Sequence, residues 1–278
     1  MSIPVFFPVL HALRKRCGYQ YPRLGRFSSF VRSQAPSSLD VELFPRVHVQ
    51  LELEDETHFQ TYWFGTRFEE PTGAILQGWW DGTSHFFDIG SNYGFFSLWA
   101  ASLHRGLEIH AFEPNPKTFE RLDKFAQANG FDNITRNSIA LSDCDTSFAF
   151  CLEECNTGSS HHVPGPGVEE DKNVIRVRAT TFDQYAADLK LQPLSSVAKI
   201  DVEGMELHVL RGMAQALDRK IFRGLCLELL EEHLAREGTS VAEVESFLRQ
   251  HGYRARDAAT AGGRQVRRPH HNGFYEPV

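Results

Sequence analysis

The chain has 278 residues, of which 41% are hydrophobic and 23% charged. This is the composition of an ordinary globular protein that buries a core without disulfide or metal staples. Its formal net charge of −7 argues against a nucleic-acid partner, because non-specific nucleic-acid binders need a broad basic surface. The five cysteines show no disulfide or zinc-site spacing, which predicts reduced thiols and a cytoplasmic location. No window approaches the roughly 18 apolar residues that a spanning helix requires, so we expect no transmembrane segment.

The first 80 residues are predicted to form an extension and a cap on the main domain. The first forty or so are basic, which indicates a solvated or partly disordered arm or, alternatively, a surface that meets an anionic partner or membrane. Residues 47–53 alternate between apolar and polar side chains, which predicts a half-buried strand. The aromatic segment Tyr62-Trp-Phe-Gly65 and a helix-like run that ends at Trp80 follow.

Strand and helix patterns alternate over residues 81–278, the predicted main domain. Strands are expected at 85–89, 107–112, 133–139, 197–200 and 224–230, with two short last strands at 252–257 and 273–277. Helices are expected at 94–104, 116–129, 181–191, 203–218 and 241–251. This alternation predicts an α/β domain with a mostly parallel sheet, whose ligand-side strand ends share one edge. A hairpin with a long loop is inserted near residues 145–180.

A glycine turn, Asp88-Ile-Gly-Ser-Asn-Tyr-Gly94, stands between the first strand and helix of this domain. We expect Gly90 and Gly94 to let the backbone pass close to a ligand, where a Cβ would collide. Glu113 ends the next strand, and its carboxylate is placed to accept hydrogen bonds from two ribose hydroxyls. Asp143, after the third strand, has two readings, either an acceptor for an adenine amino group or a turn residue that bonds its own backbone.

The spacing of this turn selects between two nucleoside ligands. A dinucleotide favours Gly-x-Gly-x-x-Gly, with its pyrophosphate on the helix N-terminus. Here the spacing is Gly-x-x-x-Gly, Asn92 crowds the turn, and Asp88 precedes it. That suits S-adenosyl-L-methionine, which has no phosphate and carries a sulfonium and an ammonium, and we expect Asp88 to bring negative charge towards it.

Three carboxylates are candidates for chemistry at the same edge of the sheet. Asp201 closes a buried strand and is the best candidate for a catalytic base, although it would also serve as the N-cap of the next helix. Glu203 follows in the predicted first helical turn. It has two interpretations, either a role in the reaction or only a favourable interaction with the helix dipole. Glu228 lies late in an apolar strand, where a carboxylate is costly unless paired.

Other polar groups near these carboxylates have more open interpretations. His233 is either a base or an ordinary surface residue. His161 and His162 lie in the Gly/Pro-rich loop, which is either functional or disordered. A divalent metal on Asp201, Glu203 or Glu228 is conceivable, because hard cations bind carboxylate oxygens. No full ligand set is visible in the sequence, so we predict no metal.

Several stretches carry a family likeness that spans roughly residues 47 to 232. The chain resembles the FkbM-type S-adenosylmethionine-dependent methyltransferases. The matching stretches are Phe87-Asp-Ile-Gly-Ser-Asn-Tyr-Gly94, Ala111-Phe-Glu-Pro-Asn-Pro116, Ala140-Leu-Ser-Asp143, Thr157-Gly-Ser-Ser160 and Lys199-Ile-Asp-Val-Glu-Gly204. The last of these is the most specific to that family.

The resemblance implies a class I, Rossmann-like methyltransferase fold, with helices on both faces of a seven-stranded sheet whose last strand is antiparallel. It implies O-methylation of a hydroxyl on a small-molecule or glycan acceptor, such as a sugar or a polyketide. By motif position, Asp88, Gly90, Asn92, Gly94 and Glu113 would line the cofactor, and Asp201 and Glu203 the reaction side. The alternatives are an NAD-dependent oxidoreductase and a non-catalytic cofactor-binding partner protein. The sequence does not predict the oligomeric state.

Overall fold

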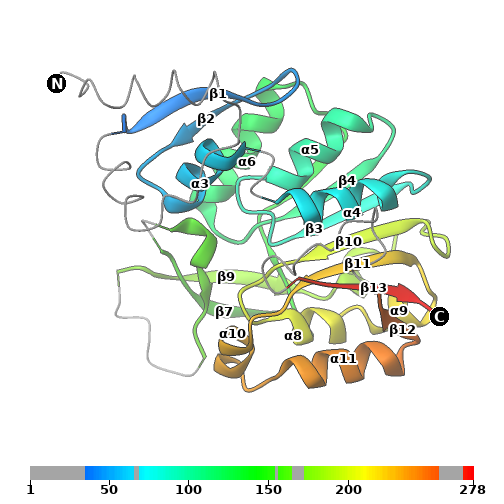
Figure 1. Cartoon of the computed structure of the whole chain (residues 1–278). Coiled ribbons are helices and arrows are strands. Elements are labelled where there is room, and N and C mark those ends of the chain that lie inside the picture. The colour runs from blue at the N-terminus through cyan, green and yellow to red at the C-terminus, as the bar shows by residue number, and fades with distance from the viewer. Residues whose placement is uncertain (1–34, 66–68, 154–155, 165–171, 257–271) are drawn as a thin grey trace.

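A seven-stranded sheet forms the centre of the molecule, as Figure 1 shows for the computed structural model. The structure describes residues 35–65, 69–153, 156–164, 172–256 and 272–278. The strand order is β12 (Tyr253–Ala255), β13 (Asn272–Pro277), β11 (Phe222–Glu228), β10 (Ser196–Ile200), β3 (His85–Ile89), β4 (Glu108–Phe112) and β5 (Ile134–Asn137). Only β13 runs antiparallel to its neighbours. This arrangement confirms the predicted class I methyltransferase topology, including its antiparallel last strand.

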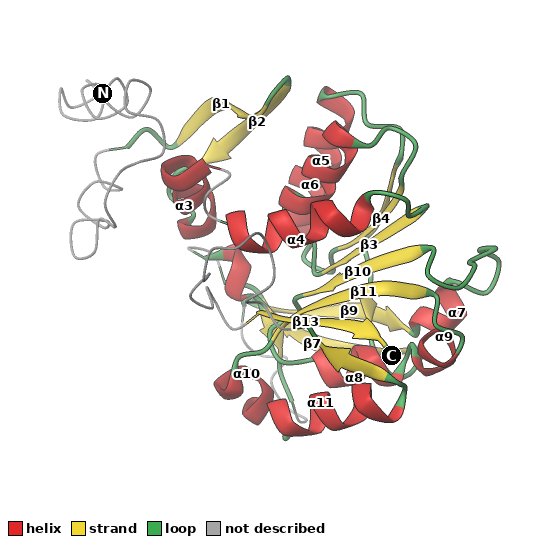
Figure 2. Cartoon of the chain, turned by 45° about the vertical axis from the view of Figure 1, so that its right-hand side comes forward, coloured by secondary structure: helices red, strands yellow, loops and turns green. Residues whose placement is uncertain are grey.

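Helices cover both faces of the sheet, as predicted (Figure 2). One face carries α4 (Glu70–Trp80), α5 (Phe95–Leu103) and α6 (Pro116–Ala128). The other carries α7 (Phe182–Tyr185), α8 (Glu206–Arg211), α9 (Ala214–Asp218) and α11 (Val241–Gln250). Local sequence sets the helix starts, because the side chains of Asn115 and Ser240 accept backbone hydrogen bonds at the beginnings of α6 and α11.

The front section packs into the same hydrophobic core as the sheet. Strands β1 (Ser38–Phe44) and β2 (Val47–Glu52) form an antiparallel hairpin, and α3 (Glu56–Phe64) follows. The apolar residues of β2 point inward and its polar residues outward, which confirms the predicted half-buried strand. Trp79 and Trp80 of α4 are buried in this core with Phe86 of β3. The predicted division at residue 80 stays a prediction, and residues 1–34 of the basic arm lie outside the described residues.

The insertion forms a second, four-stranded sheet beside the first. Its order is β6 (Ala140–Leu141), β9 (Val174–Thr180), β7 (Thr146–Cys151) and β8 (His161–His162). The antiparallel pairing of β7 with β9 confirms the predicted hairpin. The short helix η3 (Thr157–Ser159) and β8 were not predicted, because the loop that contains them has no periodic pattern.

The helix predicted over residues 203–218 is wrong in its extent. It begins only at Glu206 and divides into α8 and α9 after Arg211. At the break, a Cβ on Gly212 would stand 1.9 Å from the carbonyl oxygen of Ser142, so the chain there packs directly on another backbone. A further helix, α10 (Glu231–Arg236), was not predicted. Among the described residues, none of the helices has both the length and the apolar character needed to span a bilayer.

The contact between Gly224 of β11 and Trp79 of α4 gives a test of how α4 is held on the sheet. A Cβ on Gly224 would stand 2.3 Å from the Trp79 ring. We expect Gly224→Ala to lower the free energy of unfolding by about 1–3 kcal/mol, the usual cost of overpacking a core. Urea denaturation followed by tryptophan fluorescence measures this difference.

Gly78→Ala is the matched control, because Gly78 is an exposed residue of α4 and its added Cβ would have no neighbour within 4 Å. This variant is expected to be as stable as the wild type or up to about 1 kcal/mol more stable. Equal free energies of unfolding for the Gly224 variant and the wild type would contradict the packing argument.

Candidate active site

One pocket of about 280 Å³ lies at the carboxyl ends of the parallel strands. Six of the residues predicted from sequence line it, namely Gly90, Asn92, Glu113, Asp201, Glu203 and Glu228. Three others, Asp88, Gly94 and Asp143, are not among its lining residues. The structure therefore gathers both predicted halves of the site, the glycine turn and the carboxylates, around one cavity.

Neighbouring protein atoms require glycine at both positions of the turn, and the predicted close approach of a ligand stays a prediction. Both have positive φ, 77° at Gly90 and 90° at Gly94. A Cβ on Gly90 would stand 1.8 Å from the backbone oxygen of Asp201, and one on Gly94 would stand 2.3 Å from Leu122. Neighbouring protein thus requires glycine here. Gly90 allows the ends of β3 and β10 to touch, which places Asp201 beside the turn.

Asp88 lies behind the glycine turn and not at the pocket surface. Its side chain is 1% exposed, and one carboxylate oxygen accepts hydrogen bonds from the backbone N–H and the hydroxyl of Ser97, at 3.0 and 2.6 Å. Burial raises the pKa of this carboxyl. Asp88 thus satisfies a free N–H in the first turn of α5 and fixes that helix to β3. The predicted direct contact with the cofactor has no support in this position.

Glu113, the residue predicted to bind the ribose hydroxyls, lines the pocket. Its two carboxylate oxygens accept the backbone N–H groups of Asn92 and Asn115, both at 2.8 Å, and the residue lines the pocket while only 6% exposed. Burial raises the pKa of Glu113 to about 7. The Thr118 hydroxyl is a third hydrogen-bond partner of this carboxylate, so about one of its roughly four acceptor positions remains for a ligand. Asn92 holds its part of the turn in the left-handed region, with φ of 51°.

A buried lysine, Lys199, fixes the charge of Asp201. The Lys199 ammonium lies 2.7 Å from the Asp201 carboxylate, and its side chain is almost fully buried. Burial favours the neutral amine, but the carboxylates of Asp201 and Asp88 outweigh it and raise the pKa of Lys199. In turn, burial favours the neutral form of Asp201, but the charge of Lys199 and the hydrogen bonds from Glu228 and Lys199 together outweigh it and lower the pKa of Asp201. Sequence reasoning did not single out Lys199, although a lysine in an otherwise apolar strand was a usable signal.

Glu228 completes this group as a proton donor. It ends β11, next to β10, and its side chain hydrogen-bonds to Asp201. The negative charge of Asp201 and, secondly, burial raise the pKa of Glu228 to about 10. At neutral pH Glu228 is therefore protonated and donates to Asp201, which is ionised. Two carboxyl groups that share a proton are a common means of separating pKa values in a catalytic site.

Asp201 and Glu203 do not belong to the helix that follows them. The helix α8 begins at Glu206 with Met205 as its N-cap, so Asp201 is not the cap that the alternative interpretation assigned to it. Glu203 lies before the helix with φ of 56°, and not in a first helical turn. Its carboxylate is 2.8 Å from Nδ1 of His233 on α10, and burial and the charge of Asp201 raise its pKa to about 8.

His233 reaches this group because Gly204 lets α10 approach. A Cβ on Gly204 would stand 2.4 Å from the backbone oxygen of His233. The ligand atoms of Glu203, Glu228 and His233 lie within 4.8 Å of one another, a group that can hold a metal ion. The sequence did not show this set, because the helix that carries His233 was not predicted.

The remaining candidates divide between pocket and surface. Asp143 is exposed and accepts a hydrogen bond from the Ser142 hydroxyl at 3.3 Å, while its neighbours Ile139, Ala140 and Leu141 line the pocket instead. His162 lines the pocket and contacts Glu237 at 2.8 Å, whereas His161 does not line it. Sequence reasoning missed Thr57, Gln60 and Glu69, which line the pocket from the front section.

The buried carboxyls predict a specific dependence of stability on pH. The pKa values of Glu203 and Glu228, about 8 and about 10, lie above the ordinary value of 4.5, so the folded state binds more protons than the unfolded state between these limits. The free energy of unfolding should therefore fall as pH rises from about 5 to 8. Each group contributes at most about 1.4 kcal/mol per pH unit. Urea titrations of the wild type and of Glu228→Gln at several pH values measure the free energy of unfolding. This free energy should fall less steeply with pH in the variant. The same slope in both proteins would contradict the assigned protonation of Glu228.

The chain is similar in sequence to known methyltransferases. The "Hexuronic acid methyltransferase AglP" of Haloferax volcanii is 33% identical over 132 residues, 47% of this chain and 50% of that protein. The "31-O-demethyl-FK506 methyltransferase FkbM" of Streptomyces tacrolimicus is 27% identical over 199 residues, 60% of this chain and 71% of that protein. The chain thus spans about half the length of AglP. The solved structure of M. jannaschii TYW2 in complex with AdoMet is 9% identical, covers 88% of each chain and gives a TM-score of 0.41.

A family model for the methyltransferase FkbM domain matches residues 88–255. The matched range begins at Asp88 of the glycine turn and includes Glu113, Asp201, Glu228 and His233. The match supports the predicted methyltransferase activity, with S-adenosylmethionine as methyl donor, over the alternative oxidoreductase. Because the matched range is well over half of the sequence, the chain belongs to the FkbM methyltransferase domain family.

Proposed function

We propose that this protein is an S-adenosylmethionine-dependent O-methyltransferase that acts on a hydroxyl of a sugar or polyketide-like small molecule. The observation that carries the proposal is the ionised Asp201, held by Lys199 and by protonated Glu228 in the same pocket as the glycine turn and Glu113. A carboxylate kept ionised beside a nucleoside-binding turn suits an acceptor that must lose a proton.

The cofactor half of the pocket has groups that fit the donor. Glu113 has an acceptor position left for a ribose hydroxyl, and Phe112, Ile139 and Leu141 give an apolar wall for adenine. S-adenosylmethionine supplies a methyl group activated by a sulfonium. Lys199 keeps its positive charge paired with Asp201 and Asp88, so it does not oppose a cationic ligand as strongly as a free ammonium would.

Asp201 is proposed to orient the acceptor hydroxyl and to accept its proton. Methyl transfer is an in-line displacement, and orientation contributes about 7–11 kcal/mol when the reacting atoms are well aligned. As the new carbon–oxygen bond forms, the acceptor oxygen becomes a far stronger acid than any carboxylic acid. A carboxylate with a lowered pKa therefore still accepts the proton. A positioned base of this kind adds typically 10²–10⁴-fold to the rate.

The loop around η3 supports a hydroxyl-rich acceptor. Asn156, Ser159 and His162 line the pocket and offer side-chain donors and acceptors at its rim. The printed names of the two relatives describe methyltransferases of a hexuronic acid and of 31-O-demethyl-FK506. We therefore propose both sugars and polyketide-like alcohols as candidate acceptors.

Replacing Glu113 tests the cofactor half. We expect Glu113→Ala to weaken binding of S-adenosylmethionine and of its demethylated product by about 10- to 100-fold, because hydrogen bonds to a charged acceptor contribute about 1.5–3 kcal/mol each. Isothermal titration calorimetry measures both affinities. Glu120→Ala, an exposed carboxylate on α6, is the matched control and should bind as the wild type does. Unchanged affinity in the Glu113 variant, with its fold intact by circular dichroism, would remove Glu113 from the site.

Replacing Asp201 and Glu228 separately tests the reaction half. Asp201→Asn should slow methyl transfer by about 10²–10⁴-fold while cofactor affinity holds. Glu228→Gln should lose less than about tenfold, because a glutamine amide still donates a hydrogen bond as the protonated carboxyl does. Mass spectrometry of methylated products from a panel of hexuronic acids, glycosides and macrolide alcohols measures the rates.

The pattern of these rates separates the proposed role from its alternatives. Full activity of Asp201→Asn on the acceptor that the wild type methylates would show that Asp201 is not the base. Cofactor binding without product from any acceptor in the panel would favour the non-catalytic cofactor-binding protein instead.

A further inference from the structure

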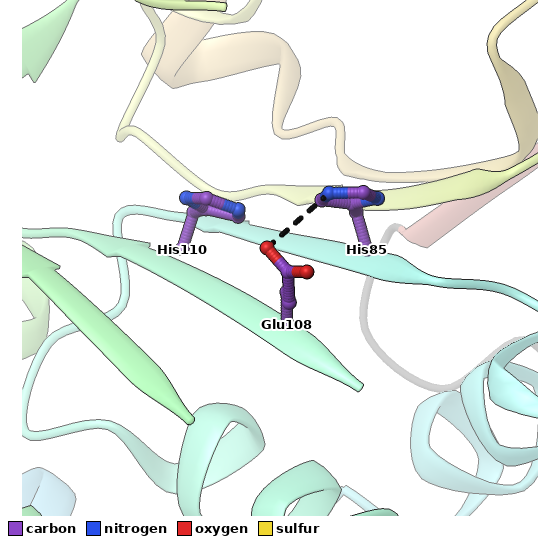
Figure 3. Close-up of side chains that lie close together, drawn as sticks. All are labelled: His85, Glu108 and His110. Carbon is purple, nitrogen blue, oxygen red and sulfur yellow. Dashed lines mark ion pairs between the residues drawn. The ribbon is translucent and has the colours of Figure 1, made fainter. Parts of the chain in front are cut away.

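Two histidines and a glutamate lie close together on β3 and β4 (Figure 3), toward the amino ends of these strands. His85 is the first residue of β3 and Glu108 the first residue of β4, and the two are direct partners across the parallel pair. His110 lies two residues further along β4 on the same face as Glu108. None of the three lines the pocket, so the methyltransferase proposal does not use them.

Their ligand atoms converge on one point. Nε2 of His85 lies 3.5 Å from a carboxylate oxygen of Glu108, and the ligand atoms of all three residues lie within 4.8 Å of one another. Zinc bonded to nitrogen and oxygen at about 2.0–2.2 Å in a tetrahedral site separates its ligand atoms by about 3.3–3.6 Å. The spacing of His85 and Glu108 already matches this value.

The two imidazole rings lie nearly parallel and close to the Glu108 carboxylate. Their planes differ by only 17°, with centroids 5.7 Å apart. Figure 3 shows the rings side by side and edge-on, with a nitrogen of each facing the other and the Glu108 carboxylate at the gap between them.

His110 has a buried nitrogen without a partner. The residue is only 4% exposed, and its Nε2 makes no hydrogen bond within the described part of the chain. Such orphaned polar atoms are rare in buried positions and call for an explanation. Its Nδ1 is 2.8 Å from the Tyr185 hydroxyl, and Nδ1 of His85 is 2.8 Å from the Ser84 hydroxyl. When each Nδ1–H donates to its hydroxyl, each Nε2 keeps a lone pair that can bind an ion. In metal sites, the hydrogen-bond partner of the second ring nitrogen usually fixes the tautomer of the histidine in this way.

We propose that His85, Glu108 and His110 bind one divalent transition-metal ion, with Zn²⁺ as the preferred ion. Two imidazoles and one carboxylate are a common zinc ligand set with a fourth position for water. The Glu108 side chain is 68% exposed, which leaves solvent access for the ion and that water. The ion would join the amino ends of β3 and β4, whose carboxyl ends lead into the glycine turn and Glu113. Its expected effect is therefore on the stability of the sheet.

The test uses the full chain after treatment with a chelator that is then removed. Titration calorimetry with Zn²⁺ should give one strong site per chain, and Co²⁺ in its place should give the visible absorption of a tetrahedral complex. Zn²⁺ should also raise the midpoint of thermal unfolding. His85→Gln and Glu108→Gln, both at the sheet edge, should each lower Zn²⁺ affinity by more than about 100-fold. Loss of a residue that only hydrogen-bonds to a ligand costs roughly 10–100-fold, and loss of a ligand should cost more.

Two control variants locate the ion. His251→Gln removes a histidine that lies outside both groups of possible metal ligands and whose Nδ1 is 2.7 Å from Asp218, and it should leave Zn²⁺ binding unchanged. His233→Gln removes a residue of the second group of three possible metal ligands in the described part of the chain, and it should also leave Zn²⁺ binding unchanged. No strong Zn²⁺ binding by the wild type would overturn the proposal. So would binding that persists in the His85 and Glu108 variants, or binding that is lost in His233→Gln, which would place the ion in the pocket instead.

Discussion

The ion pair between Lys199 and Asp201 is the interaction on which the candidate site depends. Lys199 stands directly beside Asp88 on the neighbouring strand and 2.7 Å from Asp201, so one buried ammonium compensates two carboxylates. Because a buried charge is tolerated only when paired, replacing any one of these three residues changes the charge balance of the other two. The same charge keeps Asp201 ionised, and the negative Asp201 in turn keeps the proton on Glu228. The protonation states of the site are thus set as one unit.

Close backbone approach is the second constraint. Gly90 touches the backbone of Asp201 and Gly204 that of His233, so the carboxyl ends of β3 and β10 and the start of α10 meet without side chains between them. This contact brings the turn of one strand within reach of the carboxylates of another. In a parallel sheet the carboxyl ends of the strands lie along one edge, but the segments that follow them need not touch. These two glycines allow the segments to come into backbone contact.

The front section contributes to the pocket through polar bonds to the insertion. Asp55 caps the start of α3 and also accepts a hydrogen bond from the Thr157 hydroxyl at 2.6 Å. The Thr57 hydroxyl donates to Asn156 at 3.0 Å, which fixes η3 against α3. The rim of the pocket is therefore built from segments about 100 residues apart in sequence. These bonds link the insertion to the front section at the pocket.

Local patterns in the sequence determined the strand–helix alternation, the glycine turn and the positions of Glu113, Asp201 and Glu228, because period, caps and strand ends are properties of short segments. Only the tertiary structure decided which of these groups are charged and what they touch. Asp88 faces Ser97 and not the pocket, His233 reaches Glu203 from an unpredicted helix, and His85 meets Glu108 and His110. These side-chain contacts depend on strand register and on backbone contacts between distant segments, and no single stretch of sequence indicates either of them.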